Sequence, residues 1–274
     1  MYGFVALYGE RSMRTTTILF MSCCAPMLAQ VGIGLSPMRV EMKIGPGQGY
    51  SGALELTNET GGKMRIRAEL LDFTLDQTMT PQFARSMPGE AAWSCREWLT
   101  VNPMESEIGD GEKLIIRYTM RVPVTAQARG FHCAAGFTAM PPAGEAKAIG
   151  IRNVVRAVAA FYANIGESAA KGEVTGLKIE TAGNVNSAVM SIRNDTGYHM
   201  RPAGKLEVLG SDGAVLETLD VPSFPVLPQR EQRFVLPIKT DPATVDTLRV
   251  RVDLGLDEIQ EATVRLEKGG DAAH

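Results

Sequence analysis

The chain has 274 residues, of which 45% are hydrophobic and 22% charged, a composition typical of a globular protein rather than a disordered one. Its length allows two domains of ordinary size. The 28 basic and 31 acidic residues give a net charge of −3, without the concentrated basic run that nucleic-acid binding needs. The three histidines and four cysteines form no two pairs at metal-ligand spacing, so we predict no metal and no other cofactor.

The first element along the chain is an apolar segment at residues 15–29. A membrane-spanning helix needs about 20 apolar residues, and this shorter run has the layout of a cleavable signal peptide. We expect residues 1–29 to form the signal peptide, with Met13 as the start of translation. The mature chain then begins at Gln30 and has no membrane span.

Cleavage removes two of the four cysteines, Cys23 and Cys24. Acylation of one of them is the alternative, but the residues before them lack the pattern of a lipoprotein signal. The mature chain keeps Cys95 and Cys133, and in an oxidising compartment we expect these to form one disulfide, closing a loop of ~40 residues and contributing ~3 to 4 kcal/mol. Two buried thiols are the alternative. No Cys-x-x-Cys pair is present to support redox catalysis.

Short runs that alternate apolar and polar residues predict β-strands along the whole mature chain. They lie at residues 38–44, 52–56, 64–70, 113–122, 131–137, 149–162, 189–192, 205–209, 215–219, 233–238, 247–254 and 263–266. One short helical stretch is expected at residues 89–99. The small and polar residues 166–172 suit a linker. We therefore predict an all-β chain with one domain at 30–166 and another at 167–274.

One sequence pattern occurs in both halves of the chain. Residues 56–61 read Leu-Thr-Asn-Glu-Thr-Gly and residues 192–197 read Ile-Arg-Asn-Asp-Thr-Gly, with Met-Arg following at the same offset in each. Duplication or convergence of similar corners explains this better than coincidence, and predicts two related β-domains with the same strand-turn-strand corner. Both copies match a glycosylation sequon, but Asn and Thr have turn roles that we expect here. Regular short strands favour sandwiches over barrels.

The sequence lacks the short motifs of common enzymes. It has no Gly-x-Ser-x-Gly elbow, no His-Glu-x-x-His and no phosphate loop, so we do not expect an enzyme. The glycine-rich residues 45–52 lie between two predicted strands and open no helix, which predicts a turn rather than a phosphate site. His132 and His199 are isolated from other ligand types and are expected to be sheet or surface histidines.

Four stretches of the chain resemble the PapD-like periplasmic chaperones of pilus assembly. They are Ser36-Pro37-Met38-Arg39-Val40, Leu56-Thr57-Asn58, Ala160-Phe161-Tyr162 and Ile192-Arg193-Asn194-Asp195-Thr196-Gly197-Tyr198. The resemblance implies two immunoglobulin-like β-sandwich domains in the periplasm. It further implies that the protein binds secreted pilus-like subunits by lending them a strand, and that it delivers them to an outer-membrane usher.

In that family an arginine of the first strand and a lysine before the Phe-Tyr pair bind the subunit's terminal carboxylate. Arg39 matches the arginine. The lysine position falls on Ala159 or nearby, and the closest cation is Arg156. The resemblance therefore implies a carboxylate anchor at Arg39 and Arg156, where a guanidinium alone can hold a carboxylate. The alternative for Arg39 is a solvated strand residue.

The last strand of the first domain is the donor strand in the family. Ile149, Ile151 and Val155 share one face of that strand, although Asn153 interrupts the row, and the resemblance implies that they fill the groove of an unfinished subunit. The alternative is that these side chains pack the chain's own core.

Three classes of function remain from the sequence. The first is the chaperone, which binds pilus-like subunits without turnover and so prevents aggregation through unpaired strand edges. The second is a secreted structural or adhesive protein built from the same sandwiches. An exported enzyme with a site formed only in the fold comes last.

Overall fold

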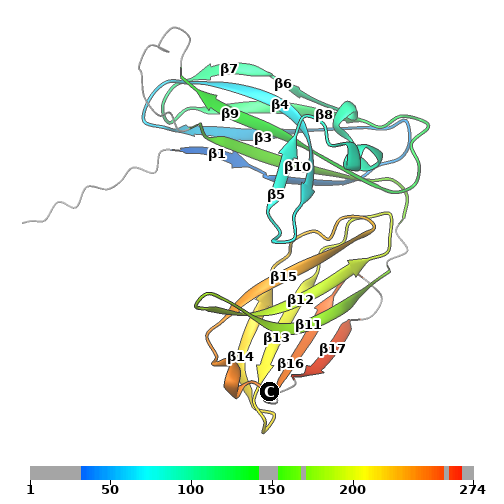
Figure 1. The fold of residues 1–274 in the computed structure, drawn as a ribbon. Coiled ribbons are helices and arrows are strands. Elements are labelled where there is room, and N and C mark those ends of the chain that lie inside the picture. Colours follow the sequence, from blue (N-terminus) through cyan, green and yellow to red (C-terminus); the bar gives the residue numbers. More distant parts are fainter. Residues whose placement is uncertain (1–31, 142–153, 168–170, 256–258, 267–274) are drawn as a thin grey trace, which may run out of the picture. The chain divides into compact units, whose positions relative to one another are not determined.

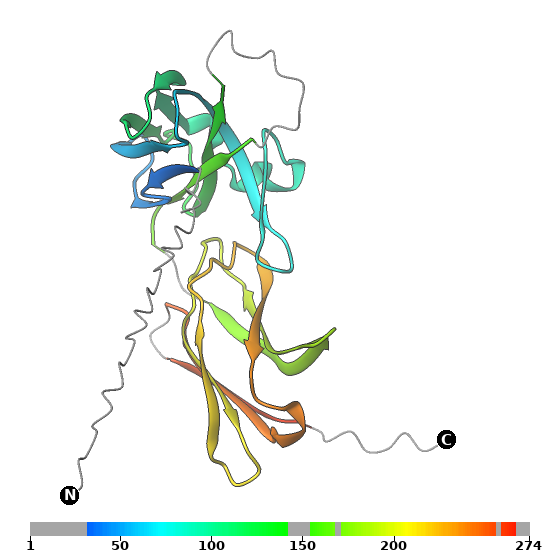
Figure 2. The same ribbon diagram turned by 90° about the vertical axis from the view of Figure 1, so that its left-hand side faces the viewer.

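The computed structural model describes residues 32–141, 154–167, 171–255 and 259–266. They form two immunoglobulin-like β-sandwiches that follow one another along the chain (Figures 1 and 2), which confirms the predicted fold class. The strands of the first sandwich lie between Gly32 and Asn164, and those of the second between Gly172 and Arg265. In the described part of the chain, no helix has the length and apolar character required to cross a bilayer.

The strands of the first sandwich are β1 (Gly32–Ser36), β2 (Arg39–Lys43), β3 (Gly49–Glu59), β4 (Met64–Leu75), β5 (Pro81–Ala84), β6 (Leu99–Asn102), β7 (Glu105–Ile108), β8 (Lys113–Arg121), β9 (Gly130–Met140) and β10 (Arg156–Asn164). Those of the second are β11 (Gly172–Ala182), β12 (Val185–Asn194), β13 (Ala203–Leu209), β14 (Val215–Val221), β15 (Arg230–Ile238), β16 (Thr247–Asp253) and β17 (Gln260–Arg265). Three short 3-10 helices complete the elements: η1 (Pro88–Trp93), η2 (Arg96–Trp98) and η3 (Pro242–Thr244).

The first sandwich packs a sheet in the order β1-β3-β8-β6 on a larger sheet in the order β2-β10-β9-β4-β5, in which β7 also pairs with β4. Alternating residues of both sheets point inward, as their sequence period of two requires. Val40 and Met42 of β2 are buried between exposed neighbours, and Phe161 of β10 is fully buried in the same core. Phe137 of β9 joins them.

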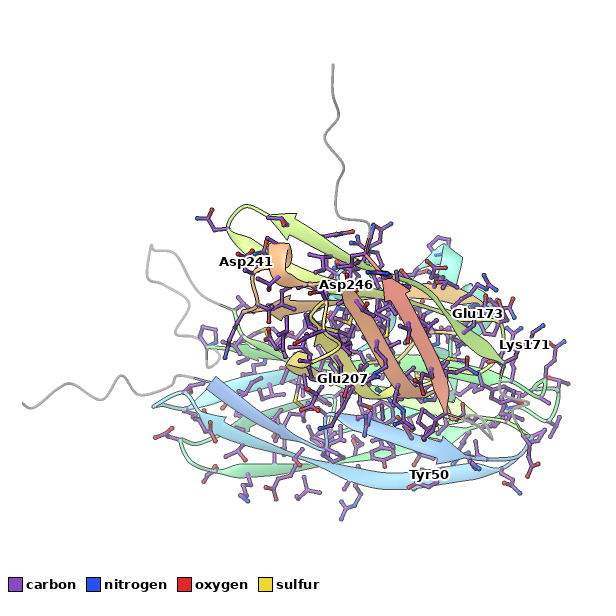
Figure 3. All side chains as sticks on the ribbon, turned by 90° about the horizontal axis from the view of Figure 1, so that it is seen from below. Tyr50, Lys171, Glu173, Glu207, Asp241 and Asp246 are labelled. Carbon is purple, nitrogen blue, oxygen red and sulfur yellow. A yellow bond between two sulfur atoms is a disulfide. The ribbon has the colours of Figure 1, made fainter. Side chains whose placement is uncertain are left out.

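The second sandwich packs the sheet β11-β12-β15 on the sheet β14-β13-β16-β17. Its core centres on Met190, Phe234 and Leu248, which are fully buried. Ion pairs lie at its surface: Arg249 of β16 is 2.7 Å from Glu207 opposite it on β13, and Arg265 of β17 is 3.2 Å from Asp246, the residue before β16. Figure 3 labels the two acidic residues, Glu207 and Asp246. In each pair the arginine is exposed and the carboxylate is partly buried. Ion pairs with an exposed partner contribute little stability, so apolar burial holds this sandwich together.

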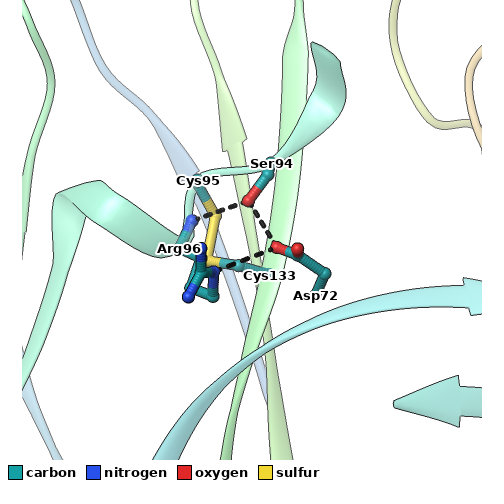
Figure 4. Close-up of a disulfide and its surroundings, with 5 residues drawn as sticks. All are labelled: Asp72, Ser94, Cys95, Arg96 and Cys133. Carbon is teal, nitrogen blue, oxygen red and sulfur yellow. Dashed lines mark hydrogen bonds and ion pairs between the residues drawn. A yellow bond between two sulfur atoms is a disulfide. The ribbon is translucent and has the colours of Figure 1, made fainter. Parts of the chain in front are cut away.

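A disulfide joins Cys95, between η1 and η2, to Cys133 of β9 (Figure 4). This confirms the predicted pairing, and the alternative of two free thiols is wrong. Next to the disulfide, the Ser94 hydroxyl donates to Asp72 at 2.5 Å and accepts from the backbone N–H of Arg96 at 3.1 Å. The disulfide therefore ties the 3-10 segment, the helical exception that the sequence predicts at 89–99, to the larger sheet.

The repeated sequence pattern forms the same corner in both sandwiches. In the second, the Asn194 amide donates to three backbone carbonyls, at 2.7, 2.9 and 3.1 Å, while its oxygen accepts from the backbone N–H and the hydroxyl of Thr196. In the first, Asn58 donates to three carbonyls at 2.7, 2.8 and 3.2 Å and accepts the same two bonds from Thr60. Both asparagines are fully buried, so their role in this structure is the turn role that the sequence predicts.

Candidate functional site

A groove of about 450 Å³, called the β10 groove, has the lining of a binding site. It is lined by Met38, Arg39, Pro81, Phe83, Arg156, Ala157, Val158, Ala160, Tyr162, Arg201, Ser223, Phe224 and Pro225. Most of these side chains are apolar or aromatic, and three are arginines. No acidic side chain is among the described residues that line it. Such a groove suits an apolar ligand that carries a negative charge.

Strand β10 runs along this groove and is paired differently in its two halves. From Arg156 to Asn164 it pairs with β9 on one side. On its other side, β2 pairs with it in parallel, and this pairing begins where Arg39 lies opposite Ala160. Among the described residues, no strand pairs with the other side of the segment from Arg156 to Ala159, which is called the free edge of β10. Its backbone groups can hydrogen-bond an added strand.

Arg39 lies at the end of this free edge. It is the first residue of β2, and its side chain is 53% exposed. Because Arg39 and Ala160 are partners in a parallel pair, their side chains point to the same face of the sheet, which is the face that lines the groove. The nearest acidic group among the described residues is Glu41, with Oε1 3.5 Å from the Arg39 Nε. Its position and exposure leave Arg39 able to bind an incoming carboxylate.

Arg156 also lines the groove, but its guanidinium is already engaged. It donates to Glu69 at 3.0 Å and to the hydroxyl of Thr138 at 3.2 Å. Ala159, where the family resemblance places the second cation, is fully buried in the core of the first sandwich, so a side chain at that position points away from the groove. The fold thus places Arg39 and Arg156 in one groove. Their role in binding a carboxylate stays a prediction.

The predicted donor-strand face is described only at one of its three positions. Ile149 and Ile151 lie outside the described residues, and Val155 is half-buried just before β10. The carbonyl of Val155 accepts a hydrogen bond from the N–H of Ala139 at 2.9 Å. In β10 the odd-numbered Ala159 and Phe161 face the core. The role of the three residues in a donor strand stays a prediction.

The face of β10 toward the groove carries the even-numbered residues, among them Val158 and Tyr162. No sequence pattern predicted a role in binding for Val158 and Tyr162. The same holds for Phe83, Phe224 and Arg201, which reach the groove from distant parts of the chain. The strand period could have identified Val158, because it alternates with the buried Ala159. The other three have no local signal in the sequence.

A cluster of charged and aromatic side chains borders the groove around Glu41. The Arg201 Nε donates to Glu41 Oε1 at 2.5 Å, and the His199 Nε2 lies 3.8 Å from the same oxygen. The interaction with His199, followed by that with Arg201, lowers the pKa of Glu41 to about 2 against the opposing effect of burial. The Arg201 guanidinium lies 4.8 Å from the centre of the Tyr162 ring, a cation–π distance.

A second acidic side chain, Glu90 of η1, is buried beside β15. It accepts a hydrogen bond from Arg230 at 2.5 Å, and its other oxygen lies 3.3 Å from the His132 Nε2, at an angle outside that of a hydrogen bond. His132 is a buried residue of β9, as the sequence predicts for an isolated histidine. His199 is neither a strand residue nor exposed, because it lies between β12 and β13 with its side chain 6% exposed beside Glu41. Among the described residues, no group of His, Cys, Asp and Glu side chains could hold a metal ion.

Comparison with known proteins finds no matching family model and no matching curated protein, but solved structures resemble the chain. The YadV chaperone is 15% identical over 85% of this chain and 99% of its own, with a TM-score of 0.46. The CupB2 chaperone of Pseudomonas aeruginosa is 13% identical over 85% and 100%, with a TM-score of 0.44. A structure of the Salmonella enterica SafA pilin in complex with the SafB chaperone is 14% identical over 86% and 96%, with a TM-score of 0.44.

Proposed function

We propose that this protein is a periplasmic chaperone that binds secreted pilus- or fimbria-like subunits through a terminal strand of the subunit. The observation that carries the proposal is the free edge of β10, which runs along an apolar groove and ends at the exposed Arg39. The client's strand extends the sheet by main-chain hydrogen bonds along residues 156–159, and its terminal carboxylate binds the Arg39 guanidinium.

The register of the sheet gives the direction of the bound strand. β2 runs parallel to β10 and begins at Arg39, so a strand that occupies the row before it lies opposite residues 156–159. Only a client strand that runs in the same direction as β2 brings its carboxyl end next to Arg39. The client therefore pairs with β10 in parallel and ends where β2 begins.

The walls of the groove support an apolar client strand. Val158 and Phe83 lie partly buried along it, and Phe224 is 37% exposed. Client side chains level with Val158 point to the same face and contact these apolar groups. Because the charged lining residues are all arginines, a basic side chain near the client's end is disfavoured by like charge.

Covering an unpaired strand keeps a secreted subunit from aggregating through its edge. Binding of this kind needs no turnover and no cofactor. Delivery of the covered subunit to an outer-membrane usher is the step that completes the proposed role, and donation of residues 149–155 to the subunit belongs to it.

The test is affinity capture of the tagged mature chain from the periplasm of its own host, with Arg39→Ala compared with wild type. Arg65→Ala is the matched control, since Arg65 is a strand arginine of the same sandwich that pairs with Glu105 outside the groove. Wild type and the control should retain a small β-rich secreted subunit, identified by mass spectrometry, that Arg39→Ala loses.

Two outcomes contradict the proposal. If Arg39→Ala retains the same subunit as wild type, the carboxylate anchor is wrong. If neither form retains a subunit and the protein itself is found in a surface assembly, the structural or adhesive function replaces the chaperone.

A further inference from the structure

Two arginines compete for one oxygen atom beside the β10 groove. The Oε1 atom of Glu41 lies 2.5 Å from the Nε of Arg201 and 3.5 Å from the Nε of Arg39. The first distance is that of a strong charge-assisted hydrogen bond, and the second is beyond one. Glu41 is therefore hydrogen-bonded to Arg201, and its contact with Arg39 is a longer and weaker ion pair.

Arg201 is fixed in this position by further contacts. Its side chain is 16% exposed, lies over the Tyr162 ring and donates to the carbonyl of Ser223 at 3.2 Å. Arg39, by contrast, is 53% exposed. Both arginines line the groove, and the one that holds Glu41 most closely is the less exposed of the two.

The repeated corner shows that this contact is not a general property of the corner. Arg65 occupies the position in the first sandwich that Arg201 occupies in the second, four residues after the glycine that ends each turn pattern, Gly61 and Gly197. Arg65 pairs with Glu105 of the neighbouring β7 strand, within its own sandwich. Arg201 instead reaches Glu41 of β2, the strand that begins with the carboxylate anchor.

We propose that Arg201 is a positioning residue for client binding, which holds the Glu41 carboxylate in a hydrogen bond and so limits its contact with Arg39 to a 3.5 Å ion pair that the client's terminal carboxylate can displace. The inference rests on the proposed function of Arg39. Glu41 and Arg39 are two residues apart on one face of β2, so Glu41 can close from the 3.5 Å ion pair to a hydrogen bond with Arg39 when Arg201 no longer holds it.

An internal carboxylate is a strong competitor. Because Glu41 is on the same strand as Arg39, its effective concentration at the guanidinium is in the range of mM or above. A client whose carboxylate must displace it loses affinity without any change in its own contacts. After loss of Arg201, Glu41 therefore occupies the Arg39 guanidinium and weakens client binding. Removal of the Glu41 charge makes Arg39 available to the client again.

The experiment measures binding of a fluorescein-labelled decapeptide of alternating threonine and valine residues that ends in phenylalanine, as the free acid and as the amide. Fluorescence anisotropy is recorded with the full mature chain as wild type, Arg201→Gln, Glu41→Gln, the double variant, Arg39→Ala, and Arg65→Gln as the matched control. We expect Arg201→Gln to weaken binding of the acid roughly fivefold, and the double variant to restore it to about the wild-type affinity. Glu41→Gln alone and Arg65→Gln leave the affinity unchanged or higher, and the amide does not respond to any of the substitutions.

The rescue separates this inference from a purely structural role for Arg201. If the double variant binds as weakly as Arg201→Gln, or if Arg201→Gln binds as well as wild type while remaining folded by circular dichroism, the positioning role is refuted and the Arg39 anchor stands. If wild type does not distinguish acid from amide, or if Arg39→Ala binds the acid as wild type does, the carboxylate anchor fails, and with it the proposed function.

Discussion

Replacement of Asn194 by alanine should unfold the second sandwich at much lower denaturant than wild type. The side chain is fully buried and makes five hydrogen bonds, three to carbonyls and two from Thr196. Alanine makes none of these, and the room left by the amide is too small for water to replace all of them. The N–H of Thr196 and the carbonyl of Leu227 then lose the partner that the structure gives them, whereas the carbonyls of Tyr198 and Val226 keep the Thr196 hydroxyl and the Met200 N–H.

The size of the effect follows from those bonds. A buried group that loses its partner costs about 1 to 3 kcal/mol, and the hydroxyl of Thr196 keeps one bond, to the carbonyl of Tyr198. We expect Asn194→Ala to lower the free energy of unfolding by about 4 kcal/mol. Asn186→Ala is the matched control on the same strand, because the Asn186 side chain bonds to Thr181 at the exposed surface, and such changes stay within about 0.5 kcal/mol.

Two optical signals distinguish unfolding of the first sandwich from unfolding of the second. Both tryptophans of the chain, Trp93 and Trp98, belong to the first sandwich, so tryptophan fluorescence follows that sandwich alone, whereas far-ultraviolet circular dichroism follows both. In urea, Asn194→Ala should lower the midpoint of the dichroism transition by about 2 M for a slope near 2 kcal/mol/M, and the fluorescence midpoint by less. Asn58→Ala should lower the fluorescence midpoint more than the dichroism midpoint, because it removes the equivalent bonds from the first sandwich, which contains both tryptophans.

A shift for Asn194→Ala no larger than that of Asn186→Ala refutes the reasoning, because the buried bonds would then contribute nothing net. Equal shifts of both signals in Asn58→Ala and Asn194→Ala refute the separate unfolding of the two sandwiches that the predicted domains at 30–166 and 167–274 imply.

Three further changes test other contacts. Replacing Cys95 and Cys133 with alanine removes a bridge across a sequence separation of 38 and should cost about 4 kcal/mol by the chain-entropy relation; a midpoint in urea equal to that of the oxidised wild type contradicts this. Glu41 has a folded-state pKa of about 2, below its model-compound value of 4.5, so its contribution is present above pH 4.5 and is lost as the pH falls through 2; because the side chain is 38% exposed, we expect it to be only about 1 kcal/mol, seen as a stability difference from Glu41→Gln that vanishes in acid. Gly204→Ala places a Cβ 2.1 Å from a backbone carbonyl of β16 and should cost about 2 kcal/mol or more, whereas Gly62→Ala, where a Cβ meets nothing within 4 Å, should be nearly neutral in the same unfolding assay.

The fold could be predicted from the sequence because the patterns that determine it are local. The period of two along β2 and β10, the breakers between strands and the repeated Asn-acidic-Thr-Gly pattern each act over a few residues, and each is present where the structure uses it. The disulfide could be predicted from counting, since only Cys95 and Cys133 follow the predicted signal peptide.

The site is less accessible to such reasoning because it is made from distant segments. Arg39 could be found from the family resemblance, but Phe83, Arg201 and Phe224 meet it only through tertiary structure. The parallel pairing of β2 with β10, which gives the free edge its limit at Ala160, has no signature in either strand alone.

The arginines of the β10 groove have a consequence for the protein's own solubility. A free strand edge invites a second copy of the same chain, and two copies that paired through residues 156–159 would place Arg39 and Arg156 of each against those of the other. Like charges facing across paired strands are unfavourable. A client that ends in a carboxylate neutralises part of this positive charge, whereas a second copy adds to it. The charge of the groove therefore favours binding of a client strand over pairing with another copy of the same chain.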